Sequence, residues 1–443
     1  MSNSLIEYYR LPENLLHLSP AEDLVDGSRF FLFGGTTCCG PLSAAIRRNG
    51  QLWHDVTAEA AVRGNVLHLP FDPAHIADHL RHERYVGSTH KQHPLTQLRS
   101  IYYAMRRFFP APVRRRLQQI YFRDWRKIEF PHWPVDSSVD SFFAAILVVA
   151  LKSGVVDKIP FVWFWPDGHS SCAILTHDVE YPAGLDFCPQ LMDMNEAAGV
   201  RSSFQIVPER RYSIPPSLLA MMRRRHFEVN VHDLNHDGRL FANEAKFRLR
   251  ATKINEYARS MGSKGFRAGV MYRNQDWYDA FQFEYDMSVP NVGHLEAQFG
   301  GCCTIMPYFV GDILELPLTT TQDYSLFTIL HEYSIDLWKI EADLIRKQHG
   351  LINFLCHPDY VREPHARQVY QQLLLFIRHL GEYENAWLAL PGEVNDWWRA
   401  RSKMTVVHDS GDWRVVGPGR ERARVAFARL DGDSLVYELG AVA

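Results

Sequence analysis

The stretch Ala173-Ile-Leu-Thr-His-Asp-Val-Glu180 decides the fold of this chain of 443 residues. Its first four residues form a short apolar run that is typical of a buried strand, and the acidic residues Asp178 and Glu180 follow where that strand ends. From about residue 170 to 395 the same rhythm of strand, loop and helix recurs. Strands that alternate with helices predict a parallel sheet, and this many units favour a closed (β/α) barrel over an open sheet.

The polar residues of this central region follow the ends of the expected strands. Further strands are expected at 203–207, 227–231, 264–267, 285–288, 314–317 and 351–355, with helices at 187–199, 216–224, 241–261 and 328–349. Four chemically active side chains lie at or just after strand ends: Asp178, His232, Arg267 and His357. Barrel enzymes carry their catalytic loops at this end of the strands, so we expect the four side chains to share one face.

The regions on either side of the barrel have a different pattern. A chain of this length is expected to form two or three domains. Residues 1–165 mix short strands (29–33 and 66–69) with helices, one of which should begin at Asp72-Pro73. We therefore predict an N-terminal α/β accessory region of unknown role at 1–165, a catalytic barrel at 166–400, and a small β appendage at 401–443.

Composition excludes several classes of function. A net charge of -3 gives no electrostatic case for binding nucleic acid or an anionic membrane, and the basic stretch 106–127 is expected to be a solvated helix face. The seven cysteines are odd in number and form no Cys-x-x-Cys pair, which indicates reduced thiols rather than a disulfide framework or a zinc ribbon. Residues 1–10 show no secretory signal, and the apolar run 142–151 is too short to span a bilayer. A cytoplasmic location is therefore expected.

The sequence His232-Asp-Leu-Asn-His236 predicts a metal site when its context is considered. Two imidazoles and one carboxylate are usual ligands of a hydrolytic zinc ion, and a further carboxylate could take a proton from the metal's water. Spacing alone does not carry this prediction, because His75 and His79 have the same spacing in the middle of a charged helix. The second pair differs because it follows a strand and shares a face with Asp178. This context predicts metal-assisted hydrolysis.

Five ordered motifs between about 170 and 360 resemble those of the polysaccharide deacetylase family, also called carbohydrate esterase family 4 or the chitooligosaccharide deacetylase homology domain. The motifs are Leu175-Thr-His-Asp-Val-Glu180, His232-Asp-Leu-Asn-His236, Gly265-Phe-Arg-Ala-Gly269, Glu315-Leu-Pro-Leu318 with Gln322-Asp-Tyr324, and Leu355-Cys-His-Pro-Asp359. The chain is most similar to a branch found in bacterial surface-polysaccharide gene clusters. The resemblance implies a distorted (β/α) barrel of the polysaccharide deacetylase type.

The resemblance also implies roles for individual residues in proton transfer. Asp178 matches the general base, and Arg267 matches the arginine that keeps this base ionised and oriented. His357 matches the general acid that protonates the departing amine, and Asp323 matches the carboxylate paired with it. Cys356 precedes this acid, but neighbouring strand residues point to opposite faces, so it is expected to be a structural thiol.

Metal and substrate contacts are implied in the same way. His232 and His236 match metal ligands, with Zn²⁺ the expected ion and other transition metals as alternatives. The family has two adjacent aspartates where Val179 intervenes here, so Glu180 is assigned as third ligand. In the alternative, Asp178 binds the metal and is not the base. Leu355 is implied to line the acetyl-methyl pocket, and backbone N–H groups near Tyr181 to complete an oxyanion hole.

The expected reaction is hydrolysis of an N-acetyl group on an amino-sugar glycan or its lipid-linked precursor in bacterial polysaccharide biosynthesis, with an O-acetyl group as the less favoured case. Two alternatives stay open: another amide hydrolase on the same scaffold, acting on a ureide or a formamido sugar, and a degenerate homologue that only binds glycan. A two-histidine, one-carboxylate iron oxygenase is disfavoured, because that site usually lies on a β-sandwich.

Overall fold

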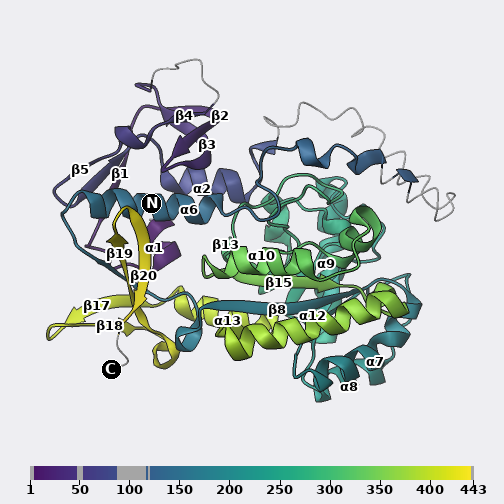
Figure 1. The fold of residues 1–443 in the computed structure, drawn as a ribbon. Helices are drawn as coiled ribbons and strands as arrows, with labels where there is room; N and C mark the ends of the chain where they lie inside the picture. The colour runs from purple at the N-terminus through teal and green to yellow at the C-terminus, as the bar shows by residue number, and fades with distance from the viewer. Residues whose placement is uncertain (1–3, 47–52, 87–115, 118–119, 441–443) are drawn as a thin grey trace.

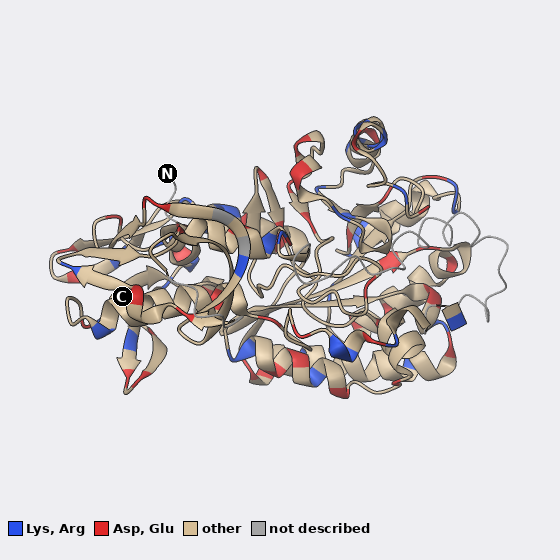
Figure 2. Ribbon diagram, turned by 90° about the horizontal axis from the view of Figure 1, so that it is seen from above, with Lys and Arg blue, Asp and Glu red and all other residues tan. Residues whose placement is uncertain are grey.

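The computed structural model describes residues 4–46, 53–86, 116–117 and 120–440 (Figure 1). The predicted solvated helix at 106–127 lies largely outside these ranges. No helix of the described residues is long and apolar enough to cross a membrane. Residues of both charge signs are interspersed along the ribbon, as Figure 2 shows from above.

A nine-stranded sheet forms the centre of the molecule. Eight of its strands run parallel: β8 (Ser171–Val179), β9 (Ser203–Ile206), β10 (Glu228–His232), β11 (Gly265–Arg267), β12 (Tyr285–Asp286), β14 (Ile313–Glu315), β15 (Leu351–Cys356) and β16 (Ala386–Leu388). The helices between and after them are α7 (Pro182–Ala197), α8 (Pro216–Arg224), α9 (Glu244–Met261), α10 (Asp336–Arg346), α11 (Pro358–Val361), α12 (Pro364–Tyr383) and α13 (Pro391–Arg401). The predicted alternation of strands and helices is therefore confirmed.

The expected closure of the barrel is wrong. The strand order is β13-β14-β12-β11-β10-β9-β8-β15, with β16 beside β8, and β13 (Tyr308–Val310) is antiparallel to β14. Within the described chain no ladder joins β15 to β14. Side chains bridge this gap instead, because Thr319 Oγ1 donates to Leu351 O (2.7 Å) and Thr320 Oγ1 donates to Asn353 O (2.8 Å). The sheet is thus a curled half-barrel that does not close, which is consistent with the distorted barrel that the motifs imply.

Strand β8 shows why the sheet has two different faces. Its side chains at Ala173 and Leu175 pack into the core shared with the helices. The alternate side chains, at Cys172 and Ile174, pack into a second core, to which residues of the N-terminal region also contribute. Successive strand residues point to opposite faces, so Asp178 continues the row of Cys172 and Ile174. The face of β8 that carries Cys172, Ile174 and Asp178 is therefore apolar at the start of the strand and polar at its end.

The N-terminal region and the C-terminal strands share the second core. The N-terminal elements are α1 (Ser4–Tyr9), β1 (His17–Pro20), β2 (Leu24–Phe33), β3 (Thr36–Ser43), β4 (His54–Asp55), β5 (Ala61–Arg63), β6 (Val66–Leu69), α2 (Pro73–Arg81), α6 (Ser138–Lys152) and β7 (Ile159–Val162). The C-terminal strands are β17 (Thr405–Asp409), β18 (Asp412–Val416), β19 (Val425–Asp431) and β20 (Ser434–Leu439). Strand β19 pairs with β7, and the Tyr437 hydroxyl of β20 is hydrogen-bonded to that of Tyr9, so the yellow β19 and β20 lie beside the purple α1 in Figure 1. The predicted appendage is thus joined to the accessory region.

Individual elements agree with the prediction where local signals are strong. Asp72 caps α2 by accepting a hydrogen bond from Ala74 N (2.8 Å), as its position before Pro73 predicts. The expected helix at 328–349 is shorter, because α10 begins at Asp336 and the residues before it form a π-helical turn, Ser325–Leu330. His331 has a positive φ of 57° after this turn, which separates it from α10.

Candidate metal centre

The predicted site residues come together at the carboxyl end of the sheet. His232 and Arg267 are the last residues of β10 and β11 and lie opposite each other in the ladder. Asp178 lies near the end of β8, and His357 directly follows β15. All four side chains are buried. The strand-end placement expected from the sequence therefore holds in space.

Three side chains form a cluster suited to a metal ion. The candidate ligand atoms of Glu180, His232 and His236 all lie within 4.8 Å of one another. These are the three residues predicted as ligands. His236 Nε2 lies 3.0 Å from Glu180 Oε1, and both imidazoles are buried. The geometry places Glu180, rather than Asp178, with the histidines in this cluster.

The hydrogen bonding of His232 fits a metal ligand. Its Nδ1 lies 3.1 Å from the carbonyl oxygen of Arg267, so this nitrogen carries the hydrogen and donates it. The opposite nitrogen, Nε2, then presents a lone pair, and it is buried without a hydrogen bond. A histidine whose Nδ1 is held by a carbonyl is a common arrangement around protein-bound zinc. The residues present therefore fit a divalent transition metal such as zinc.

Asp178 is ionised despite its burial. Burial alone would raise its pKa, but the neighbouring His232 and Arg267 outweigh this effect and leave the pKa below its ordinary value. Arg267 Nη1 donates to Asp178 Oδ1 (3.0 Å), and His232 Nε2 lies 3.6 Å from Asp178 Oδ2. Arg267 is itself held by the Thr176 hydroxyl (2.8 Å) and by the carbonyl of Met287 (2.9 Å). The arginine thus fixes both the charge and the position of the carboxylate.

The pKa of His357 is raised, whereas that of Asp178 is lowered. Its Nδ1 donates to Asp323 Oδ1 at 2.6 Å, and its backbone N–H donates to Asp323 Oδ2 at 2.7 Å. Burial would lower the pKa of this imidazole, but Asp323 outweighs burial and raises the pKa to about 10. The other nitrogen, Nε2, faces the cluster and lies 3.7 Å from Glu180 Oε1. A proton donor and an ionised carboxylate therefore flank the same three ligand residues.

The two predicted substrate contacts differ in how the structure places them. Leu355 is fully buried and packs against Met271 and Leu318 in a small apolar cluster. The backbone N–H of Tyr181 instead donates to Asp359 Oδ2 (3.3 Å). In this arrangement the N–H is already engaged, so the expected oxyanion role of Tyr181 requires it to leave Asp359.

Asp359 and Arg211 border the site without having been given a role from the sequence. Asp359 accepts hydrogen bonds from Glu180 N (3.1 Å) and Gly184 N (2.9 Å), which fixes the start of α7 beside the cluster. A Cβ at position 184 would lie 2.5 Å from Asp359 Oδ2, so glycine is required there. Arg211 donates to the carbonyl of His236 (2.5 Å). Asp359 belongs to the fifth motif, whereas Arg211 lies in an unpatterned loop that offered no signal.

Other residues singled out in the sequence lie away from the chemistry. Cys356 packs into the core shared with the helices, on the opposite face from His357, and its burial raises the pKa of the thiol. His75 is exposed on α2 and His79 is half-buried there. Neither histidine belongs to a three-residue ligand cluster within the described chain. The placement of both His75 and Cys356 agrees with the sequence-based prediction.

No protein-family model matches this chain, and no curated protein matches it. Among solved structures, it is similar to a protein assigned as a polysaccharide deacetylase from Mycobacterium smegmatis, with 19% identity and a TM-score of 0.43 over 57% of this chain and 98% of the other. PuuE allantoinase matches with 12% identity and a TM-score of 0.43, over 53% and 92% of the two chains. A protein assigned as a polysaccharide deacetylase from Pseudomonas aeruginosa PAO1 matches with 12% identity and a TM-score of 0.43, over 53% and 93%.

Proposed function

We propose that the protein is a metal-dependent hydrolase that removes the N-acetyl group from an amino sugar of a glycan or of a lipid-linked glycan precursor. The observation that carries the proposal is the pairing of Asp178 and His357 across one ligand cluster. The pKa of the first is lowered and that of the second is raised, so at neutral pH one is a base and the other an acid. Titratable groups whose environments separate their pKa values in this way are typical of general acid–base catalysis.

Glu180, His232 and His236 would hold the metal ion. When bound, such an ion polarises a carbonyl oxygen and lowers the pKa of a water molecule. The burial of both histidines restricts competing water, and the Nδ1 hydrogen bond of His232 fixes the ring in the tautomer that a ligand needs. The three residues thereby define where the scissile carbonyl must lie.

Asp178 takes the proton from the attacking water. Arg267 keeps this carboxylate ionised before attack, because the guanidinium stabilises the charged form. Oδ1 is occupied by the arginine, which leaves Oδ2 directed toward His232 and the cluster. One oxygen therefore anchors the base while the other is available for the proton.

His357 gives its proton to the departing nitrogen. An amide anion is a very poor leaving group, so breaking the C–N bond of an N-acetyl sugar requires this protonation. Asp323 holds the imidazole by Nδ1, which leaves Nε2–H facing the ligand cluster. The general acid is therefore oriented before substrate binds.

We assign the buried apolar cluster of Leu355, Met271 and Leu318 to the acetyl methyl group, as the motif resemblance implies for Leu355. A methyl group gains free energy when it leaves water for such a surface, at about 25 cal/mol per Å² of buried area. A formyl group has no methyl to bury, and a cyclic ureide would place polar N–H groups there. This observation supports deacetylation over the formamido-sugar and ureide alternatives. The place of the reaction in bacterial surface-polysaccharide assembly is inferred from the motif resemblance alone.

Product analysis tests the proposal directly. The zinc-loaded protein is incubated with N-acetylated amino-sugar oligomers, N-formyl sugars and a cyclic ureide, and acetate, formate and ring-opened product are quantified separately. We expect acetate from the first substrates only, with activity lost on chelation and restored by zinc. Formate or ureide product in excess of acetate would replace the proposal by that alternative. Tight sugar binding without any product would indicate a degenerate homologue.

A further inference from the structure

An open groove lies on one side of Trp133, between the N-terminal region and the segment that follows Asp323. The side chains that line it include Trp125, Arg126, Trp133, His294, Leu330 and Glu332. Its volume is about 330 Å³, which lies at the lower end of the range of small-molecule sites. The groove therefore combines aromatic walls with charged groups of both signs at its edge.

The rings of Trp125 and Trp133 form the wall of this groove, and the buried ring of His294 lies behind Trp133. The rings of Trp133 and His294 are stacked, with centroids 5.9 Å apart and planes inclined by 20°. Trp125 meets Trp133 edge-on, with ring centroids 4.7 Å apart. Both tryptophans are half-buried, so each keeps part of its surface accessible. Such a surface suits a ligand with a flat apolar face and a polar edge, which is the character of a pyranose ring.

The chain segment that carries Trp133 is held against the barrel by hydrogen bonds. Asp136 is fully buried and accepts hydrogen bonds from His132 N (2.7 Å) and Ser138 N (2.8 Å). Its own N–H donates to Asn291 Oδ1 (2.8 Å), and Asn291 Nδ2 donates back to the carbonyl of Asp136 (2.6 Å). The backbone beside Trp133 is thus fixed before a ligand arrives, which reduces the ordering cost of binding.

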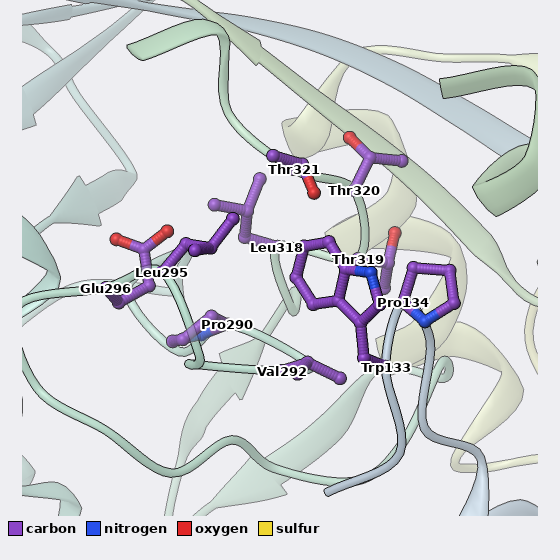
Figure 3. A pocket seen from close by; sticks show the side chains of 10 residues that line it. All are labelled: Trp133, Pro134, Pro290, Val292, Leu295, Glu296, Leu318, Thr319, Thr320 and Thr321. Carbon is purple, nitrogen blue, oxygen red and sulfur yellow. The ribbon is translucent and has the colours of Figure 1, made fainter. Parts of the chain in front are cut away.

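Trp133 also connects the groove to the candidate metal centre. On its other side lies a narrow pocket, and Figure 3 shows the indole pointing into this pocket beside Thr319 and below Leu318. Leu318 packs against Leu355, the residue assigned to the acetyl methyl group. The same segment continues through Thr321 to Asp323, which holds the general acid. The segment that lines the narrow pocket therefore leads directly to the residue that holds the general acid.

We propose that Trp133, with Trp125 and His294, forms a binding subsite for the sugar unit next to the one that is deacetylated. The subsite rests on the proposed function for the identity of its ligand, an acetylated amino-sugar chain. Arg126, whose guanidinium lies over the Trp125 ring (5.0 Å to the centroid), and Glu332 line the same groove and supply charged groups for the sugar hydroxyls. The N-terminal region thus acts in substrate selection by supplying both tryptophans.

Calorimetric titration tests the subsite independently of turnover. The zinc-loaded Asp178→Asn protein, which the proposed function makes inactive, is titrated with β-1,4-linked N-acetylglucosamine oligomers of one to four sugars. We expect affinity to rise from one sugar to two, and Trp133→Ala to weaken binding of the longer oligomers about tenfold while affecting the single sugar less. Trp133→Phe keeps a flat ring and should retain most of the gain, whereas Trp133→Leu keeps apolar bulk alone and should lose it.

Trp413→Ala provides the matched control, because Trp413 is also half-buried and contacts a histidine, His408, edge-on, but in the hairpin of β17 and β18. It should leave the binding constants unchanged. If the Asp178→Asn protein with Trp133 intact shows no gain in affinity with oligomer length, the subsite is refuted. The same holds if Trp133→Leu binds the oligomers like Trp133→Phe. If the length dependence is seen but wild-type protein releases no acetate, the proposed function fails while the subsite stands. If acetate is released but Trp133→Ala binds the oligomers normally, the subsite fails while the proposed function stands.

Discussion

Asp178 and Asp140 are both buried carboxylates, and their environments drive their pKa values in opposite directions. Burial favours the neutral form of each. At Asp178, the imidazole of His232 and the guanidinium of Arg267 overcome this effect, and the pKa falls. Asp140 receives hydrogen bonds from Tyr8 Oη (2.9 Å), Thr304 Oγ1 (2.8 Å) and a backbone N–H, all neutral donors. Its pKa rises to about 6.

The difference separates a carboxylate kept for chemistry from one kept for architecture. Asp140 lies in α6 and joins α1 to the loop at residues 304–305 of the barrel, so its hydrogen bonds hold two regions together. Asp178 holds no such junction and faces the ligand cluster instead. Burial of an acid is therefore not by itself a sign of catalysis; a nearby permanent cation is the stronger signal.

Asp178→Asn should have the largest effect on turnover. The amide keeps the shape of the side chain but cannot accept a proton, so we expect kcat for acetate release to fall by about 10³-fold or more. Bound zinc, measured by atomic absorption after dialysis, should be retained, because Asp178 lies outside the ligand cluster. Loss of zinc together with activity would instead make Asp178 the ligand, as in the alternative assignment.

His357→Gln should have the next largest effect, and its size should depend on the leaving group. Without the general acid, the amine must leave unprotonated, so we expect turnover of an N-acetyl sugar to fall by about 10²- to 10³-fold. A phenyl acetate ester has a leaving group that needs little protonation, and its hydrolysis should fall much less. Equal losses on both substrates would show that His357 positions substrate rather than donating a proton.

Asp323→Asn should have a smaller effect on turnover, and that effect should depend on pH. Asp323 is the main group that raises the pKa of His357 to about 10, so its neutralisation should lower that pKa. The imidazole is active only when protonated, and the alkaline limb of the kcat profile should therefore move to lower pH. We expect a loss of about tenfold near neutral pH that shrinks as the pH falls. An unchanged alkaline limb would assign that limb to another group.

Sequence reasoning succeeded where local pattern sets the geometry. Strand alternation placed Cys356 and His357 on opposite faces, and the strand ends gathered Asp178, His232 and Arg267. It failed on closure of the barrel, because the side-chain hydrogen bonds of Thr319 and Thr320 replace a backbone ladder that periodicity assumes.

Long-range contacts were equally invisible from the sequence. Asp140 joins residues 132 and 164 positions away, and no local spacing records such a contact. Trp133 lies in the N-terminal region, where its approach to His294 follows from tertiary packing alone. The catalytic residues at strand ends could therefore be predicted from the sequence. The contacts between the N-terminal region and the barrel could not.

Asp140→Asn should have the smallest effect on turnover and a measurable effect on stability. The variant removes the charge while keeping an acceptor for Ile305 N, and the two hydroxyls can turn to accept from the amide. Because Asp140 is outside the ligand cluster, we expect kcat to stay within about twofold. Urea unfolding at several pH values then shows what the carboxylate does.

The sign of the pH effect follows from the raised pKa. The folded-state pKa of about 6 exceeds the ordinary value of 3.8, so the contribution of Asp140 is fully present below about pH 4 and is lost as the pH rises through 6. A pKa difference of roughly two corresponds to about 3 kcal/mol. The stability of Asp140→Asn relative to wild type should therefore improve by about this amount between pH 4 and 7. A relative stability that falls with pH would mean that Asp140, like Asp178, is kept ionised by a cation, and would erase the contrast between the two carboxylates.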